Sequence, residues 1–129
     1  MQKMNLSIEK NDKYVIVKLL DEKVNDNISS ELKHQFIDLN NEGARNIILD
    51  LSKVSYCDSS GLNTILAGNM MCKSSNGSFV LSGLNEKVRR IIHNSQLEKV
   101  LLICPTVEEA IDLVFMEEIE RDLINGTNN

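Results

Sequence analysis

The chain has 129 residues, 42% of them hydrophobic and 26% charged, which fits one globular domain that can bury a core without disulfides or metal. Its 19 acidic residues outnumber 14 basic ones, and this excess argues against a nucleic-acid-binding protein, which would carry clustered Lys and Arg. The chain has neither a signal-peptide apolar segment nor the roughly 18 to 20 apolar residues that span a bilayer, so we predict a cytoplasmic protein without a membrane partner.

The first half of the chain predicts a β-hairpin followed by a helix. Residues 6–8 alternate between apolar and polar, and after the turn-forming pair Asn11-Asp12 the run 14–20 is β-branched and almost continuously apolar. A polar loop follows. We expect Asn27 or Ser29 to cap a helix whose apolar side chains recur every three or four positions.

The main candidate for a functional segment is residues 56–62, in the middle of the chain. It follows the short apolar run 46–51, which is typical of a central strand buried on both faces, and it precedes a helix-type run. Asp58, Ser59 and Ser60 therefore lie at a strand-to-helix junction, where loops often carry function. Any of the three could also be the N-cap of the helix, and capping and function can coexist.

The last third predicts strands at 78–82 and 100–103 with a short helix at 88–92 between them. Pro105 ends the last strand, and Thr106 with Glu109 three positions later has the pattern of a capping box that starts a final helix.

The final helix is strongly acidic, with seven acidic residues and one basic residue between positions 108 and 122. This face is either solvated or a docking surface for a basic partner. We expect its buried stripe to consist of Val107, Ala110, Ile111, Val114, Ile119 and Leu123. The domain proper is predicted to cover residues 1–116, and residues 117–129 to be an acidic helix extension with a frayed tail from 125.

Two strands followed by alternating helices and strands predict an α/β fold: a single mixed, mainly parallel sheet with helices packed on it, and the two N-terminal strands as a hairpin. The stretch 56–62 then lies at the carboxyl end of a central strand, where ligands of such sheets tend to bind.

The sequence does not predict catalytic residues. His34 and His93 have no nucleophile or ligand partner at a motif spacing, and the common nucleotide, hydrolase and zinc signatures are missing. We therefore expect no enzyme, no cofactor and no metal site. The three cysteines are expected to be reduced and mostly buried, with Cys57 the most reactive of them.

The ordered set of segments resembles the STAS domain, and specifically the bacterial anti-sigma factor antagonists, over nearly the whole chain. Its most specific part is Asp58-Ser59-Ser60-Gly61-Leu62 between the buried strand and the helix. The helix 88–92 and the segment 97–103 add to the match. One departure lies after the second strand, where the family often has a Gly-Glu-Leu/Ile-Asp-like segment and residues 20–26 contain no glycine.

The resemblance implies a phosphorylation-switched regulator. Its partner would be an anti-sigma factor that is also a serine kinase, bound by the unphosphorylated protein so that the sigma factor is freed. Ser59 would be the phosphate acceptor, with Ser60 as second choice, and Gly61 would let the following helix come close to its neighbours. The implied partner-binding residues are Asp58, Ser59, Ser60, Gly61 and Leu62, with Asp21 and Asn25 from the segment after the second strand.

A second interpretation stays open. The chain could be a STAS module that acts as a scaffold, as a small-ligand-binding domain or as a transport-accessory subunit, without a phosphorylation switch. The two interpretations differ in whether Ser59 carries phosphate.

Overall fold

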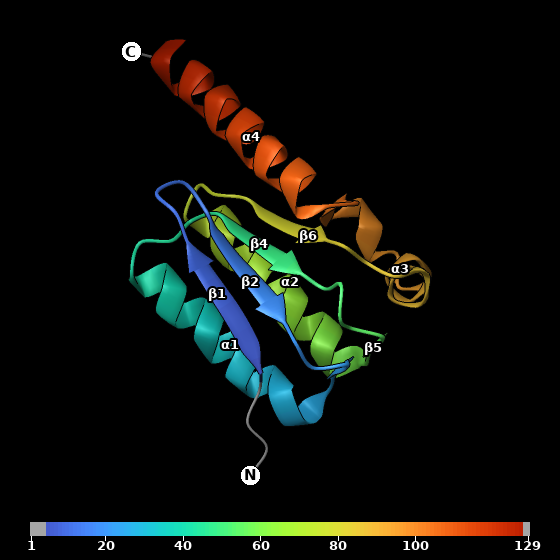
Figure 1. The fold of residues 1–129 in the computed structure, drawn as a ribbon. Coiled ribbons are helices and arrows are strands. Elements are labelled where there is room, and N and C mark those ends of the chain that lie inside the picture. The colour runs from blue at the N-terminus through green and yellow to red at the C-terminus, as the bar shows by residue number, and fades with distance from the viewer. Residues whose placement is uncertain (1–4, 128–129) are drawn as a thin grey trace.

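A five-stranded sheet forms the centre of the computed structural model, which describes residues 5–127 (Figure 1). The spatial order is β1-β2-β4-β6-β7, in which β1 and β2 are antiparallel and every other neighbouring pair is parallel. This arrangement confirms the predicted α/β class and the N-terminal hairpin. The strands are β1 (Leu6–Lys10), β2 (Val15–Leu19), β4 (Ile47–Asp50), β6 (Phe79–Ser82) and β7 (Leu102–Cys104).

Helices cover both faces of the sheet (Figure 1). α1 and α2 pack side by side on one face, and α4 crosses the other face over β4, β6 and β7. Each parallel connection runs through a helix, as expected for parallel neighbours. The helices are α1 (Asp26–Asn41), α2 (Ser59–Ser74), α3 (Glu86–Asn94) and α4 (Val107–Thr127), with a short 3₁₀ turn at Leu97–Lys99. Within residues 5–127, none of the helices is long and apolar enough to cross a membrane.

A second, two-stranded sheet, which the sequence did not predict, lies beside the main one. β3 (Lys23–Val24) and β5 (Tyr56–Cys57) pair in parallel, and the backbone N–H of Asp58 extends the ladder by donating to the carbonyl oxygen of Val24. This small sheet joins the segment before α1 to the segment before α2.

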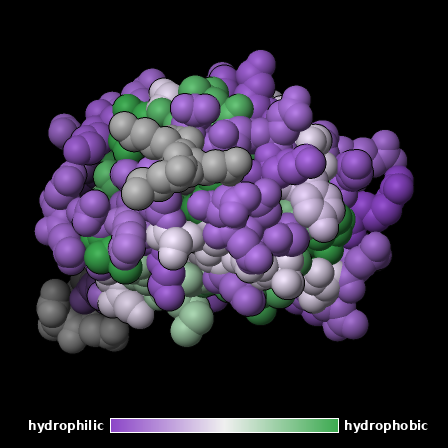
Figure 2. All heavy atoms as spheres, turned by 90° about the horizontal axis from the view of Figure 1, so that it is seen from below, coloured by the Kyte–Doolittle hydropathy of each residue, from purple (hydrophilic) through white to green (hydrophobic). Residues whose placement is uncertain are grey.

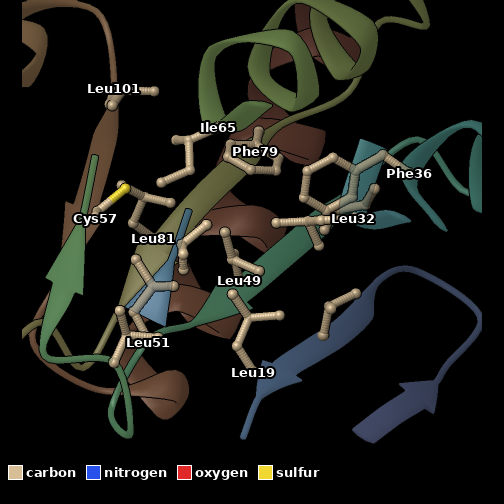
Figure 3. Close-up of a cluster of buried hydrophobic side chains, with 14 of the residues drawn as sticks. Leu19, Leu32, Phe36, Leu49, Leu51, Cys57, Ile65, Phe79, Leu81 and Leu101 are labelled. Carbon is tan, nitrogen blue, oxygen red and sulfur yellow. The ribbon is translucent and has the colours of Figure 1, made fainter. Parts of the chain in front are cut away.

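The core has two parts because the sheet is covered on both faces. The larger part lies between the sheet and α1 and α2, where the rings of Phe36 and Phe79 meet edge to face at a centroid distance of 5.5 Å (Figure 3). The smaller part lies under α4, where Ile48 and Val80 contact Ala110 and Val114. All four residues of β4 are buried, as predicted for a central strand.

Two sequence-based expectations about element ends were wrong. The N-cap of α1 is Asn25 and not Asn27 or Ser29, because the Asn25 side chain accepts the N–H of Asn27. The last strand begins at Leu102, since the 3₁₀ turn occupies the preceding residues and leaves Val100 49% exposed. The start of α2 at Ser59 agrees with the prediction that Asp58, Ser59 or Ser60 is its N-cap.

The predicted buried stripe of α4 is correct only near its start. Ala110 and Val114 are buried, whereas Ile119 and Leu123 are 59% and 65% exposed. Glu118 takes the sheet-facing position instead, and its carboxylate pairs with Arg45, in the loop before β4, and with Arg121 of α4 itself. The predicted frayed tail, residues 125–129, continues the helix to residue 127, and its last two residues lie outside the described part of the chain.

Candidate functional site

Ser59 is the first residue of α2, and the residue before it caps the helix. The Asp58 Oδ1 accepts the backbone N–H of Gly61 at 2.9 Å, so Asp58 is the N-cap among the three candidates. Ser59 itself is exposed, and none of the described residues hydrogen-bonds its hydroxyl. The Ser59 hydroxyl therefore has no role in holding the helix end, and it is open to solvent.

Ser60 ties α2 to α1. Its hydroxyl donates to the Asp26 Oδ1 in the first turn of α1, and its carbonyl oxygen accepts the hydroxyl of Thr64 at 3.1 Å. The Thr64 hydroxyl also lies 3.3 Å from the carbonyl oxygen of Ser29. The N-termini of the two helices are thus held next to each other. Their unpaired N–H groups and dipoles place two positive helix ends at this site, partly offset by the carboxylates of Asp26 and Asp58.

Gly61 allows the close approach that the sequence suggested. A Cβ atom at this position would lie 2.6 Å from the Sγ of Cys57 and closer still to the carbonyl oxygen of Val24. Because real Cβ atoms essentially never come within 3.0 Å of such atoms, only glycine fits between the start of α2 and the small β3–β5 sheet. The close packing of Gly61 therefore determines where Ser59 lies relative to β3.

The other implied partner-binding residues are less directly connected with Ser59. Asp21 accepts the backbone N–H of Asn5 at 2.8 Å, at the start of the first strand. The side-chain oxygen of Asn25 is occupied by its capping hydrogen bond in α1, and Leu62 is half-buried against the main core. The structure therefore brings together Asp58, Ser59 and Ser60 at the start of α2. Asn25 directly follows β3, the strand that pairs with β5.

Two residues of the site were not singled out from the sequence. Tyr56 lies on β5 and is 42% exposed, whereas its neighbour Cys57 points into the core. Asp26 accepts the hydrogen bond of the Ser60 hydroxyl. The alternation of an exposed and a buried residue is the period of a strand, and this pattern in the sequence could have indicated Tyr56.

Figure 2 shows the molecule from the end at which α1 and α2 begin, and this surface is mainly hydrophilic with small, separate apolar patches.

The site presents the exposed Ser59 hydroxyl, and the neighbouring Cys57 thiol is not activated as a nucleophile. Burial, together with the nearby Asp58 carboxylate, raises the pKa of the Cys57 thiol to about 12, so this thiol stays protonated at neutral pH. No group of three or more His, Cys, Asp or Glu residues that could hold a metal ion exists within residues 5–127. A cavity of about 270 Å³, lined by the β1–β2 turn and the end of α1, contains none of the predicted site residues.

Comparison with known proteins adds the family. A family model for the STAS domain matches residues 5–110. A Thermotoga maritima protein provisionally described as an anti-sigma factor antagonist is 36% identical over 89 residues, which are 69% of this chain and 74% of that relative. These names describe regulators and not enzymes, in agreement with the prediction from the sequence.

Solved structures give the same result. The crystal structure of a Thermotoga maritima protein, also provisionally described as an anti-sigma factor antagonist, has a TM-score of 0.77 at 32% identity and covers 84% of this chain and 93% of its own. The anti-sigma factor antagonist SpoIIAA in its unphosphorylated form has a TM-score of 0.73 at 21% identity, covering 85% and 96%. Phosphorylated SpoIIAA of Bacillus has a TM-score of 0.66 at 21% identity, covering 85% and 99%. At this identity the likeness to SpoIIAA shows the fold alone.

Proposed function

The chain belongs to the STAS domain family, and from this premise we propose that it is an anti-sigma factor antagonist switched by phosphorylation of Ser59. Unphosphorylated, it binds an anti-sigma factor that is also a serine kinase, and the sigma factor is released. The observation that carries the proposal is the division of roles at the start of α2, where Asp58 caps the helix and the exposed Ser59 hydroxyl has no partner among the described residues.

A phosphate on Ser59 is compatible with the fold. It would add roughly −1.5 to −2 charge beside Asp58 and Asp26, which is unfavourable, but it would also lie at a helix N-terminus, where unpaired N–H groups and the helix dipole favour an anion. These opposing effects leave a net change in folding free energy of about 1 kcal/mol or less. Neither the Asp58 cap nor the Ser60–Asp26 bond uses the hydroxyl that would be modified.

The same phosphate weakens a partner interface strongly. A partner that packs over Ser59 would have to bury the new charge next to carboxylates that offer no counter-ion, which costs several kcal/mol. In this proposal the contact surface consists of the half-exposed Asp58 and Ser60 around Ser59, with Tyr56 beside them. Asn25, Gly61 and Leu62 support this surface through capping and packing. Asp21, whose carboxylate accepts the backbone N–H of Asn5, completes the proposed partner-binding set.

The serine kinase role of the partner, and the cytoplasm as the place of action, belong to the same proposal. The support is the family and the existence of SpoIIAA in an unphosphorylated and a phosphorylated form. A kinase must reach a hydroxyl, and Ser59 is more accessible than Ser60, whose hydroxyl is bound to Asp26. Ser59 is therefore the first choice for the acceptor.

The experiment compares Ser59→Asp with Ser59→Ala. Each variant is titrated by calorimetry against the anti-sigma factor recovered with the protein from its own cells. We expect Ser59→Asp to keep the thermal midpoint of the parent but to bind at least about tenfold more weakly, a difference of about 1.4 kcal/mol. Ser59→Ala should bind like the parent and should take up no phosphate from ATP, as measured by mass spectrometry.

A matched control places the same charge at the other end of the same helix. Ser74 is exposed and lies 15 residues after Ser59, a distance of about 22 Å along α2 at about 1.5 Å per residue. This is beyond the Debye length of roughly 8 Å at physiological salt, so Ser74→Asp should bind like the parent. Equal affinities of Ser59→Asp and Ser59→Ala would leave Ser59 as an ordinary first-turn residue and would contradict the switch.

A further inference from the structure

Large apolar side chains are exposed along the C-terminal half of α4, among them Met116, Ile119, Leu123 and Ile124. Met116, Ile119 and Leu123 are 65%, 59% and 65% exposed, and Figure 1 shows α4 on the outer side of the sheet with no other described element over it. The match to the STAS family model ends at residue 110, whereas α4 continues to Thr127. Isolated exposed apolar residues need no explanation, but a periodic set on one helix face does.

Met116, Ile119 and Leu123 form one stripe. They follow the spacing i, i+3 and i+7, and at about 100° per residue they fall within about 60° of each other around the helix. By the same geometry the stripe lies nearly opposite the sheet-facing positions of Ala110, Val114 and Glu118. This spacing is the pattern with which a helix contacts a second helix.

The orientation of α4 is fixed by charged contacts, so the stripe cannot turn toward the sheet. The Glu118 Oε1 lies 2.7 Å from Nη2 of Arg45, and its Oε2 lies 2.7 Å from Nη1 of Arg121. Arg121 also donates to the hydroxyl of Ser78, next to the start of β6. Glu118 is 7% exposed. Although burial alone would raise the pKa of Glu118, the hydrogen bonds and charges of the two arginines outweigh it and lower this pKa.

The charges beside the stripe decide what it can bind. Glu120 and Asp122 are exposed and flank the stripe on its two sides, and Asp112 lies in line with it one turn before Met116. A second copy of the chain packed through this stripe would bring these carboxylates close to those of its partner, which is unfavourable. An anionic lipid surface would be repelled in the same way, whereas a basic partner would be attracted.

We propose that Met116, Ile119 and Leu123, flanked by Glu120 and Asp122, form a docking stripe for a basic amphipathic helix of a partner protein. The partner places its apolar residues along the stripe and its Lys and Arg side chains against the two flanking carboxylates. The docking stripe lies on α4, which covers the face of the sheet opposite to α1 and α2. This proposal is therefore independent of the function proposed for Ser59.

The direct test uses a designed peptide and the full chain. The probe is a fluorescent helical peptide of about 18 residues, long enough to form a helix, with Leu at i, i+3 and i+7 and Lys or Arg beside them. We expect fluorescence anisotropy to show binding that weakens at least about tenfold for Ile119→Ser/Leu123→Ser. A peptide with Glu in place of each Lys and Arg should bind at least about tenfold more weakly than the basic peptide.

Matched controls distinguish binding at the docking stripe from nonspecific hydrophobic binding and from effects of the Ser59 site. Met70→Ser/Val100→Ser removes two exposed apolar side chains elsewhere and should bind the basic peptide like the parent. Ser59→Asp should also bind it like the parent, so the two proposals can fail separately. The Ile119→Ser/Leu123→Ser variant should keep the thermal midpoint, because both side chains are more than half exposed.

A photo-crosslinking residue at position 119 then identifies the natural partner in cells, and mass spectrometry of the crosslinked segment should find a basic, amphipathic helical sequence. Unchanged peptide binding by Ile119→Ser/Leu123→Ser, or equal binding of the acidic peptide, overturns the proposal. So does a crosslink to an acidic segment or the absence of any crosslink. A dimer in sedimentation that this variant dissociates would assign the stripe to a second copy of the chain, and variant-sensitive binding to anionic phosphatidylglycerol vesicles would assign it to a membrane.

Discussion

Gly61→Ala tests whether the close contact between the start of α2 and the small β3–β5 sheet stabilises the protein. The added Cβ would lie 2.6 Å from the Sγ of Cys57 and even nearer to the carbonyl oxygen of Val24. The sulfur belongs to a buried side chain, and the oxygen belongs to the backbone and already accepts the N–H of Asp58 at 3.1 Å. Neither atom can move aside freely, so the first turn of α2 must shift away from β3.

The expected magnitude is a balance of three effects. Replacing glycine by alanine inside a helix stabilises it by about 1 kcal/mol when space is available. Inserting a methyl group into a packed contact costs about 1 to 3 kcal/mol, and weakening the Asp58–Val24 hydrogen bond costs about another 1 kcal/mol. We therefore expect Gly61→Ala to lower the free energy of unfolding by about 2 kcal/mol.

Urea unfolding followed by circular dichroism measures this difference, and the slope of the free energy with urea should stay unchanged. Asn63→Ala is the matched control, because Asn63 is exposed in the same helix and its replacement should be neutral or slightly stabilising. If Gly61→Ala is as stable as the parent, the contact with Val24 is not tight. The argument that glycine is required at this position would then be wrong.

Two further predictions follow from the titratable groups. With thiol reagents at pH 8, Cys104 should react first and Cys57 and Cys72 slowly, because Cys104 is the least buried of the three. Burial raises the pKa of all three thiols, and for Cys57 and Cys72 it does so to about 12. Faster labelling of Cys57 than of Cys104 in folded protein would restore the expectation from the sequence, which the burial of Cys57 contradicts. Glu118→Gln should destabilise the protein by about 1 to 2 kcal/mol at pH 7. Because the folded-state pKa of Glu118 is lowered from its usual 4.5, this difference should be complete above about pH 4.5 and disappear as the pH falls through the folded-state pKa. A difference that persists at pH 2 would show that the loss comes from packing and not from the ion pairs.

Much of the fold could be predicted from local patterns in the sequence. The run 46–51 is apolar at nearly every position, and a strand covered by helices on both faces requires this pattern. The backbone N–H of Glu109 does donate to the Thr106 hydroxyl at 3.1 Å, as the capping pattern predicts. The position of Ser59 at a helix start could be predicted for the same reason, since turn and cap chemistry depends on residues close together in the chain.

Features that depend on distant residues could not be predicted. The β3–β5 sheet pairs Lys23 with Tyr56, and two-residue strands leave no periodic pattern to recognise. The sequence pattern of α4 indicated that Ile119 is buried. It could not show that Arg45, 73 residues away from Glu118, holds a carboxylate at the sheet-facing position and leaves Ile119 outside. Contacts between distant parts of the chain therefore decided which side of α4 faces the sheet.

The two faces of the sheet explain why the Ser59 site and the docking stripe should act independently. Ile48 contacts the core under α4, whereas its neighbours Ile47 and Leu49 contact the core on the side of α1 and α2, and all three are fully buried. A close-packed core deforms little, and coupling between distant sites needs an element with two alternative arrangements. A central strand that is packed on both sides is a poor candidate for such an element. A charge on Ser59 should therefore change binding at the start of α2 and leave the docking stripe available, so that one molecule can hold one partner on each side of the sheet.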